Sequence, residues 1–240
     1  MDTPKLKKDR TKKQKKILLL DLFCKAGGCS MGYYFAAQDL GYEIEIIGVD
    51  IEAQPNYPFT FIQGDAMVHL KKNWRKYTHI HASPPCQKYS NSTAPTRINN
   101  PDKEYSDICV TVQSFLESIN KPSVIENVLQ APIRQDLVLN GDMFKLQVLR
   151  SRKFELNNFF MMQPFAPKKL GTVKNGDYAM CVGNGQLKVK GGKRFKVPGS
   201  NILEVWSNAM AIWWMTREEL REAIPPSYTQ YIGHYFFQKQ

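Results

Sequence analysis

The chain lacks the features that mark secreted, metal-bound and membrane-spanning proteins. It has five cysteines, an odd number, and no C-x-x-C pair. Neither a disulfide framework nor a zinc site is therefore indicated, and we expect no metal and a reducing, cytoplasmic compartment. No apolar stretch is long enough to span a bilayer. Residues 17–20 are apolar, but Asp21 ends the run and no small-residue cleavage site follows, which argues against a signal peptide.

Acidic residues are also scarce. The chain has 22 Asp and Glu against 33 Lys and Arg, and its net charge is +11. Much of the excess lies in residues 1–16, which form a basic arm, and in a second cluster: Lys188, Lys190, Lys193, Arg194 and Lys196. Either cluster alone is as well explained by a solvated surface. Two clusters, together with the motifs below, favour a nucleic-acid partner.

The hydrophobic pattern predicts an α/β fold. With 240 residues and 42% hydrophobic content, the chain can form one core of ordinary size. Buried strands are predicted at residues 17–23, 44–50, 59–62, 79–83 and 124–128, and helices at residues 30–40, 69–76 and 106–119. Strands and helices in alternation indicate a parallel sheet with helices on both faces.

The last third of the chain differs in composition and in hydrophobic pattern. From about residue 157, glycines and scattered basic and aromatic residues replace the helical period, which predicts loops and short strands. Helical pattern returns near Thr216, a candidate N-cap with Glu219 at the capping-box position, and residues 228–237 are predicted to form a final helix on the sheet. We therefore divide the chain into an arm (1–16), an α/β domain (17–156), a small irregular region (157–212) and a returning segment (213–240).

Residues suited to cofactor binding follow the first three strands. Gly27 and Gly28 lie between a strand and a helix, where glycine lets a ligand approach the backbone, although a packing turn explains them equally. Asp50 ends the next strand, a position at which carboxylates commonly bind ribose hydroxyls. Asp65 could accept a hydrogen bond from an adenine amino group, or simply cap a turn or helix.

Two residues with reactive side chains lie at or just after the ends of the next two strands. Cys86 comes directly after the strand at 79–83, and Glu126 lies in the strand at 124–128. A lone cysteine is more often an inert core residue, and a lone glutamate is often salt-bridged. A carboxyl at a buried strand end has a raised pKa, however, which suits an acid working near neutral pH.

These motifs, read in order, resemble those of the cytosine carbon-5 methyltransferases. The matching segments are Asp21-Leu22-Phe23 with Gly27-Gly28, Pro84-Pro85-Cys86-Gln87, Glu126-Asn127-Val128, Arg150-Ser151-Arg152 and Ala223-Ile224-Pro225-Pro226. The resemblance covers residues 18–233 and looks closest to a compact, bacteriophage-encoded form, which implies a host-cell cytoplasm. It implies a Rossmann-like class I methyltransferase fold with a mixed, mostly parallel sheet.

The resemblance also implies a covalent mechanism. Cys86 would add to carbon 6 of cytosine, and Glu126 would engage nitrogen 3, so that carbon 5 can attack a methyl sulfonium. Arg152 would contact the carbonyl oxygen of the base, Arg150 would support the nucleophile loop, and Asn127 would hold its own loop. A basic run such as residues 150–153 is, without the resemblance, usually a solvated face.

The implied cofactor is S-adenosylmethionine, with S-adenosylhomocysteine as product. The residues implied for its site are Phe23, against the adenine, and Gly27, Gly28, Asp50, Ile51, Asp65, Ala66, Pro84 and Ala223. The implied nucleic-acid contacts are Gln87, Ser90 and the second basic cluster. Lys25 stands where the family has its first glycine, Val148 where it has glutamine, and Arg221-Glu222 where it has Gly-Asn.

The short irregular region bears on the substrate. Few side chains are available there to read bases, which predicts short or relaxed sequence specificity and salt-dependent affinity for DNA. A target cytosine in duplex DNA would have to flip out of the stack, and we expect a monomer. Other interpretations stay open: methylation of tRNA or of a free cytosine nucleotide, a catalytically silent nucleic-acid-binding protein, and transfer of another group from an altered cofactor.

Overall fold

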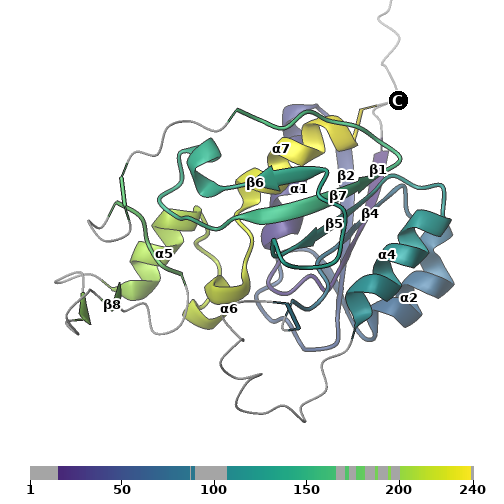
Figure 1. Cartoon of the computed structure of the whole chain (residues 1–240). Helices are drawn as coiled ribbons and strands as arrows, with labels where there is room; N and C mark the ends of the chain where they lie inside the picture. The colour runs from purple at the N-terminus through teal and green to yellow at the C-terminus, as the bar shows by residue number, and fades with distance from the viewer. Residues whose placement is uncertain are drawn as a thin grey trace, which may run out of the picture.

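The fold is built on one seven-stranded sheet (Figure 1). The structure, a computed structural model, describes residues 16–86, 88–89, 107–165, 171–172, 177–181, 187–188, 194–195 and 201–238. The sheet strands are β1 (Lys16–Leu22), β2 (Glu43–Asp50), β3 (Thr60–Gln63), β4 (His79–Ala82), β5 (Ser123–Asn127), β6 (Leu137–Leu139) and β7 (Arg152–Asn157). Their order is β3-β2-β1-β4-β5-β7-β6. The pairs among β1 to β5 are parallel, and β7 runs antiparallel to both its neighbours.

Helices cover both faces of this sheet (Figure 1). One face is covered by α1 (Gly28–Asp39) and α7 (Pro226–Phe236), and the other by α2 (Ala66–Asn73) and α4 (Ile108–Ser118). Helices α5 (Ile202–Met210) and α6 (Arg217–Glu222) pack with each other, and η1 (Trp74–Lys76) and η3 (Gly141–Phe144) are 3-10 turns. A separate two-stranded sheet pairs β8 (Leu187–Lys188) with β9 (Arg194–Phe195). None of the helices in the described part of the chain combines the length and apolar character needed to cross a bilayer.

Strand alternation produces two hydrophobic cores. In β1, Ile17 and Leu19 are buried with residues of α1 and α7, whereas Leu20 and Leu22 are buried with residues of α2 and α4. Successive side chains of a strand point to opposite faces, so one buried strand serves both layers. Helices α1 and α7 approach closely at Gly32, where an added Cβ would lie 2.0 Å from the Pro226 carbonyl oxygen.

The predicted α/β architecture is confirmed, and so is the capping box: Thr216 accepts from the Glu219 backbone while the Glu219 carboxylate accepts from the Thr216 backbone. One alternative is excluded, and one expectation is wrong. The basic run at 150–153 is not a solvated face, because β7 is buried and the Lys153 ammonium donates to the Ile133 carbonyl at 3.0 Å. The irregular region contains a helix, α5, whose buried Trp206 and other apolar residues form a third core cluster with α6.

Candidate active site

The candidate site lies where the strand order changes direction. The chain runs from β1 outward to β2 and β3, and then crosses to β4 and β5 on the other side of β1. Ligands of such sheets bind at the carboxyl ends of the strands at this switch point. Leu22 lies beside Ala82, and Ala82 beside Ile125. The residues that follow, in the loops after β1 and β4 and at the end of β5, therefore meet at one edge.

Glu126 and Arg152 form a buried ion pair at this edge. Arg152 Nε lies 3.0 Å from Glu126 Oε1, and their side chains are 17% and 7% exposed. Burial raises the pKa of the Glu126 carboxyl, while Arg152, a hydrogen bond with Ser83 and the charge of Arg150 oppose that rise. Because β7 runs antiparallel to β5, the first residue of β7 is brought to the end of β5. The glutamate and arginine predicted from the sequence thus lie in contact.

Cys86, in the loop after β4, lies at the same edge of the sheet as the Glu126–Arg152 ion pair. It is the one cysteine of the chain that is not fully buried. Burial raises the pKa of its thiol, the Glu126 carboxylate raises it further, and the Arg152 guanidinium lowers it. These mutual effects mean that thiol, carboxyl and guanidinium lie within range of one another's charge.

Asn127 ties the loop after β4 to the end of β5. Its Nδ2 donates to the Pro84 carbonyl at 3.0 Å, and its Oδ1 accepts from the Val128 backbone at 2.8 Å. Asn127 and Pro84 are both buried. This amide therefore fixes the backbone that presents Cys86 relative to the strand that carries Glu126.

Arg150 lies deeper and contacts other segments than expected. Its guanidinium donates to the carbonyls of Cys181, at 3.3 Å, and Arg221. Tyr228 Oη donates to the Arg150 carbonyl at 2.9 Å. Burial lowers the pKa of Arg150 to about 10. Within the described residues, its hydrogen bonds thus join the start of β7 to α6 and α7, and none of them reaches the Cys86 loop.

The turn after β1 has an unusual backbone. Phe23, Lys25 and Gly27 all have positive φ, at 58°, 44° and 82°. The Phe23 backbone N–H donates to the Val49 carbonyl at 2.8 Å, and the side chain of Phe23 is half-buried. The alternation of left-handed residues turns the chain sharply between β1 and the start of α1.

Asp50 holds this turn against the loop after β2. Its Oδ2 accepts from the Lys25 backbone at 3.1 Å, and its Oδ1 accepts from the Glu52 backbone at 3.1 Å. Each carboxylate oxygen keeps a further lone pair, so ribose hydroxyls can still be bound there. The neighbouring Ile51 is 69% exposed and offers an apolar surface beside the carboxylate.

The two glycines are required by packing. An added Cβ at Gly27 would lie 2.8 Å from the Pro58 ring, and one at Gly28 would lie 2.3 Å from the Ile224 carbonyl oxygen. The segment after α6, which includes the buried Ala223, therefore lies directly on the turn. The Trp214 indole N–H donates to the Ala26 carbonyl at 2.9 Å and strengthens this contact.

The remaining residues predicted for the site either have a structural role or lie outside the described part of the chain. Asp65 is the N-cap of α2, with Oδ1 accepting from the Val68 backbone at 2.8 Å, and Ala66 is buried as the first helical residue. The capping alternative for Asp65 is thus observed. Gln87, Ser90, Lys190, Lys193 and Lys196 lie outside the described residues. Lys188 pairs with Arg194 in the two-stranded sheet, where the backbone alone is described.

Sequence reasoning missed a buried polar network below the site. Ser83 Oγ lies 3.0 Å from His81 Nε2, and His81 Nδ1 lies 2.9 Å from Tyr33 Oη. Burial lowers the pKa of His81 to about 3, so its ring is neutral. Ser83 also hydrogen-bonds Glu126. The available signal was a polar residue inside an otherwise apolar strand, which requires buried partners.

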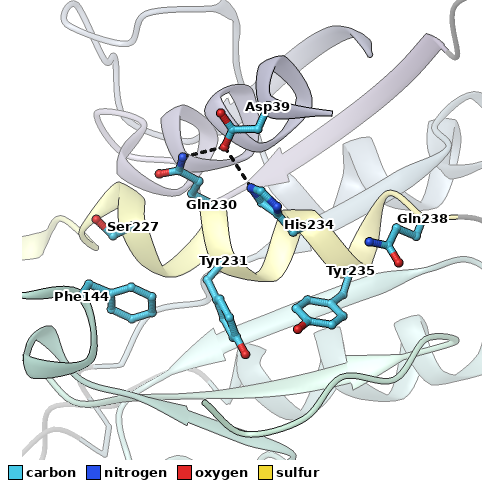
Figure 2. Close-up of a pocket in the computed structure, with 8 residues that line it drawn as sticks. All are labelled: Asp39, Phe144, Ser227, Gln230, Tyr231, His234, Tyr235 and Gln238. Atoms are coloured by element: carbon cyan, nitrogen blue, oxygen red, sulfur yellow. Dashed lines mark hydrogen bonds and ion pairs between the residues drawn. The ribbon is translucent and has the colours of Figure 1, made fainter. Parts of the chain in front are cut away.

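A separate hollow of ≈ 590 Å³ lies along α7, between Asp39 at the end of α1 and Phe144 at the end of η3. Figure 2 shows its lining, in which Tyr231 and Tyr235 project from α7 on one side and Asp39 bonds Gln230 and His234 on the other. None of the predicted site residues lines it.

Comparison with known proteins supports the fold. No protein-family model matches the chain, and no curated protein matches it. Among solved structures, the Dnmt2 methyltransferase of S. pombe is similar, with 12% identity over 91% of this chain and 98% of that chain and a TM-score of 0.54. A likeness at this identity concerns the fold. The protein thus has the Rossmann-like fold of the S-adenosylmethionine-dependent methyltransferases.

Proposed function

We propose that this protein transfers the methyl group of S-adenosylmethionine to carbon 5 of cytosine in DNA. The observation that carries the proposal is the convergence of Cys86, Glu126 and Arg152 beside the turn after β1. A thiol and an acid of raised pKa, next to a dinucleotide-type turn, fit covalent activation of a pyrimidine ring.

The residues around the turn suit the proposed cofactor. Asp50 is positioned for ribose hydroxyls, and the exposed Ile51 for the adenine ring. The buried Asp21 keeps one carboxylate oxygen, Oδ1, without a hydrogen-bond partner among the described residues. An unpaired buried acceptor beneath the turn is compatible with the ammonium group of a methionine tail above it. When bound, the cofactor supplies the methyl group as an electrophile.

The protein's own residues make carbon 5 reactive. The Cys86 thiolate forms a bond to carbon 6, and the electron pair of the 5,6 double bond shifts so that carbon 5 becomes nucleophilic. Glu126, with its raised pKa, holds a proton at nitrogen 3 and offsets the negative charge that develops in the ring. Arg152 holds that carboxyl, and its remaining N–H donors would contact the carbonyl oxygen of the base. Loss of the carbon 5 proton and departure of Cys86 restore the ring.

We propose DNA as the substrate because the protein carries a large positive charge. The net charge of +11 and the basic arm favour a polyanion over a free nucleotide. The region between β7 and α6 is short for a base-reading domain, which favours short or relaxed specificity and a flipped target base. Methylation of tRNA or of a free nucleotide by the same residues is the second candidate, since the catalytic group would be unchanged.

The test uses purified protein, tritiated S-adenosylmethionine and unmethylated duplex DNA of mixed sequence, with tRNA and dCMP in parallel and a Cys86→Ala control. Acid-stable 5-methylcytosine in DNA, absent from the control, supports the proposal. Label found in tRNA or dCMP instead would identify that molecule, and not DNA, as the substrate. Cofactor binding without transfer to any substrate rejects the enzyme, and salt-dependent DNA binding then favours a silent binding protein.

A further inference from the structure

A chain of hydrogen bonds leads from α1 to the loop after β4. Tyr33 Oη, on α1, lies 2.9 Å from His81 Nδ1 on β4, and His81 Nε2 lies 3.0 Å from Ser83 Oγ. Tyr33 and His81 are fully buried, and Ser83 is half-buried. The chain therefore runs from the core beneath α1 to the carboxyl edge of the sheet, where the candidate site lies.

The register of the sheet brings the end of this chain to Glu126. Ala82 pairs with Ile125 in the parallel ladder of β4 and β5, and both are buried with residues of α2 and α4. Ser83 and Glu126 come next in the two strands, so they lie side by side on the opposite face, the one covered by α1. Ser83 hydrogen-bonds the Glu126 carboxyl there. The second donor to this carboxyl is Arg152, whose Nε lies 3.0 Å from Oε1.

Burial fixes the direction of each hydrogen bond in the chain. The Tyr33 hydroxyl has His81 as its one partner among the described residues, and a buried hydroxyl without an acceptor is costly, so Tyr33 donates to Nδ1. Burial lowers the pKa of His81 to about 3, so the neutral ring has one proton, on Nε2, which it donates to Ser83 Oγ. The Ser83 hydrogen then points to the Glu126 carboxyl, a stronger acceptor than the Cys29 sulfur 3.9 Å away.

We propose that Tyr33, His81 and Ser83 are positioning residues, which together direct the Ser83 hydrogen to the candidate acid. Because Arg152 and Ser83 both donate to the Glu126 carboxyl, neither takes its proton, and that proton is presented to the base. The bond from Ser83 also favours the charged form of the acid, so that the proton can be released near neutral pH. The inference rests on the proposed function, in which Glu126 engages nitrogen 3 of cytosine.

The first test observes the His81 tautomer by nitrogen NMR of the histidine rings. The signals of His81 are those that Tyr33→Phe shifts and Tyr77→Phe does not. We expect a proton on Nε2 and none on Nδ1 between about pH 5 and 8. A proton on Nδ1 overturns the inference, because the Ser83 hydrogen would then face the ring and not the carboxyl.

The second test follows the titration of the Glu126 carboxyl by carbon NMR, with Glu126→Gln identifying its signal. Ser83→Ala removes a donor to the charged carboxylate and should raise the pKa of Glu126 by about one pH unit. Tyr33→Phe should produce a smaller rise, although Tyr33 makes no hydrogen bond to Glu126, because the His81 proton and the Ser83 hydroxyl lose their fixed direction.

Tyr77 provides a matched control, because it is another buried tyrosine paired with a histidine. Its Oη lies 2.8 Å from His69 Nε2. Tyr77 precedes β4 and so lies at the opposite edge of the sheet from Glu126, which is near the end of the parallel strand β5. Tyr77→Phe should therefore leave the Glu126 titration unchanged.

The other groups that act on Glu126 are common to the wild type and Ser83→Ala, so their effects cancel in that comparison. They are Arg150 and Arg152 at the start of β7, Asp21 on β1, Cys29 and Tyr33 on α1, Cys86 after β4, Cys109 on α4 and Tyr228 on α7. Tyr33→Phe removes no charge, because burial raises the pKa of Tyr33 well above its ordinary value.

Methyl transfer provides the functional measurement. The rate should fall at alkaline pH as Glu126 loses its proton, and this fall should move up by about one pH unit in Ser83→Ala, whereas a purely structural loss lowers the rate equally at every pH. A Glu126 titration that Ser83→Ala leaves unchanged, or that Tyr33→Phe and Tyr77→Phe affect alike, overturns the inference. Both NMR tests need neither cofactor nor substrate, so the expected NMR results without any methyl transfer count against the proposed function alone.

Discussion

Replacing Asp21 by asparagine should abolish a loss of stability that the wild type undergoes as pH rises. Asp21 is 1% exposed in β1, an interior strand of the sheet. Its Oδ2 accepts from the Ser30 hydroxyl, which also lies 2.6 Å from Tyr57 Oη, while Oδ1 has no partner among the described residues. Burial raises the pKa of this carboxyl to about 7, the Ser30 hydrogen bond opposes the rise, and the charges of Asp50 and Glu126 add to it.

The sign follows from proton linkage. The unfolded carboxyl, with an ordinary value near 3.8, loses its proton well before the folded one. The stability contributed by the bound proton is complete below that value and is lost as pH rises through about 7. At 1.36 kcal/mol per pH unit, the wild type loses about 2 kcal/mol between about pH 5.5 and 8.5 from this group. The asparagine side chain of the variant has no proton to lose in this range.

The assay is urea denaturation of Asp21→Asn and wild type at both pH values, with Glu204→Gln, which replaces an exposed carboxylate on α5, as the control. The free energy of unfolding of Asp21→Asn relative to wild type should rise by about 2 kcal/mol over that interval, while the Glu204→Gln difference stays constant. Other titrating groups are common to all three proteins and cancel. An Asp21→Asn difference that does not change with pH would refute the reasoning, because it would mean that Asp21 is already ionised at the lower pH.

Three further substitutions test the fold and the site. Gly32→Ala should destabilise the α1–α7 packing by about 1–3 kcal/mol, because its Cβ would overlap the backbone of α7, whereas Gly64→Ala, with open space around it, should be neutral in the same denaturation assay. Asn127→Ala removes the donor to the Pro84 carbonyl and should cost about 1–3 kcal/mol together with most methyl transfer, with cofactor affinity kept. Glu126→Gln keeps the shape of the side chain and should lower the transfer rate by about 10²- to 10⁴-fold in single-turnover measurements, and a rate within about twofold of wild type would contradict its role as the acid.

The elements predicted from sequence are those with strong local signals. The apolar strands β1 and β4 and the capping box of α6 are set by residues close in the chain. Strand β7 was missed because its pattern depends on distant partners: Lys153 is buried only because the Ile133 carbonyl accepts its ammonium group. Helix α5 was missed because glycine-rich neighbours conceal a short helix. The sequence motifs placed Cys86 and Glu126 at strand ends. The pairing of the strands, which brings those ends together, could be seen only in the sheet.

The departures from the family pattern illustrate the same limit and bear on function. Read along the chain, Lys25 and the Arg221-Glu222 pair are separate departures, which keep the silent-protein alternative open. In the fold the charged groups of Lys25 and Glu222 lie 3.5 Å apart with opposite sign. This contact depends on how the segment around α6 packs against the turn after β1, which no local pattern in either segment predicts.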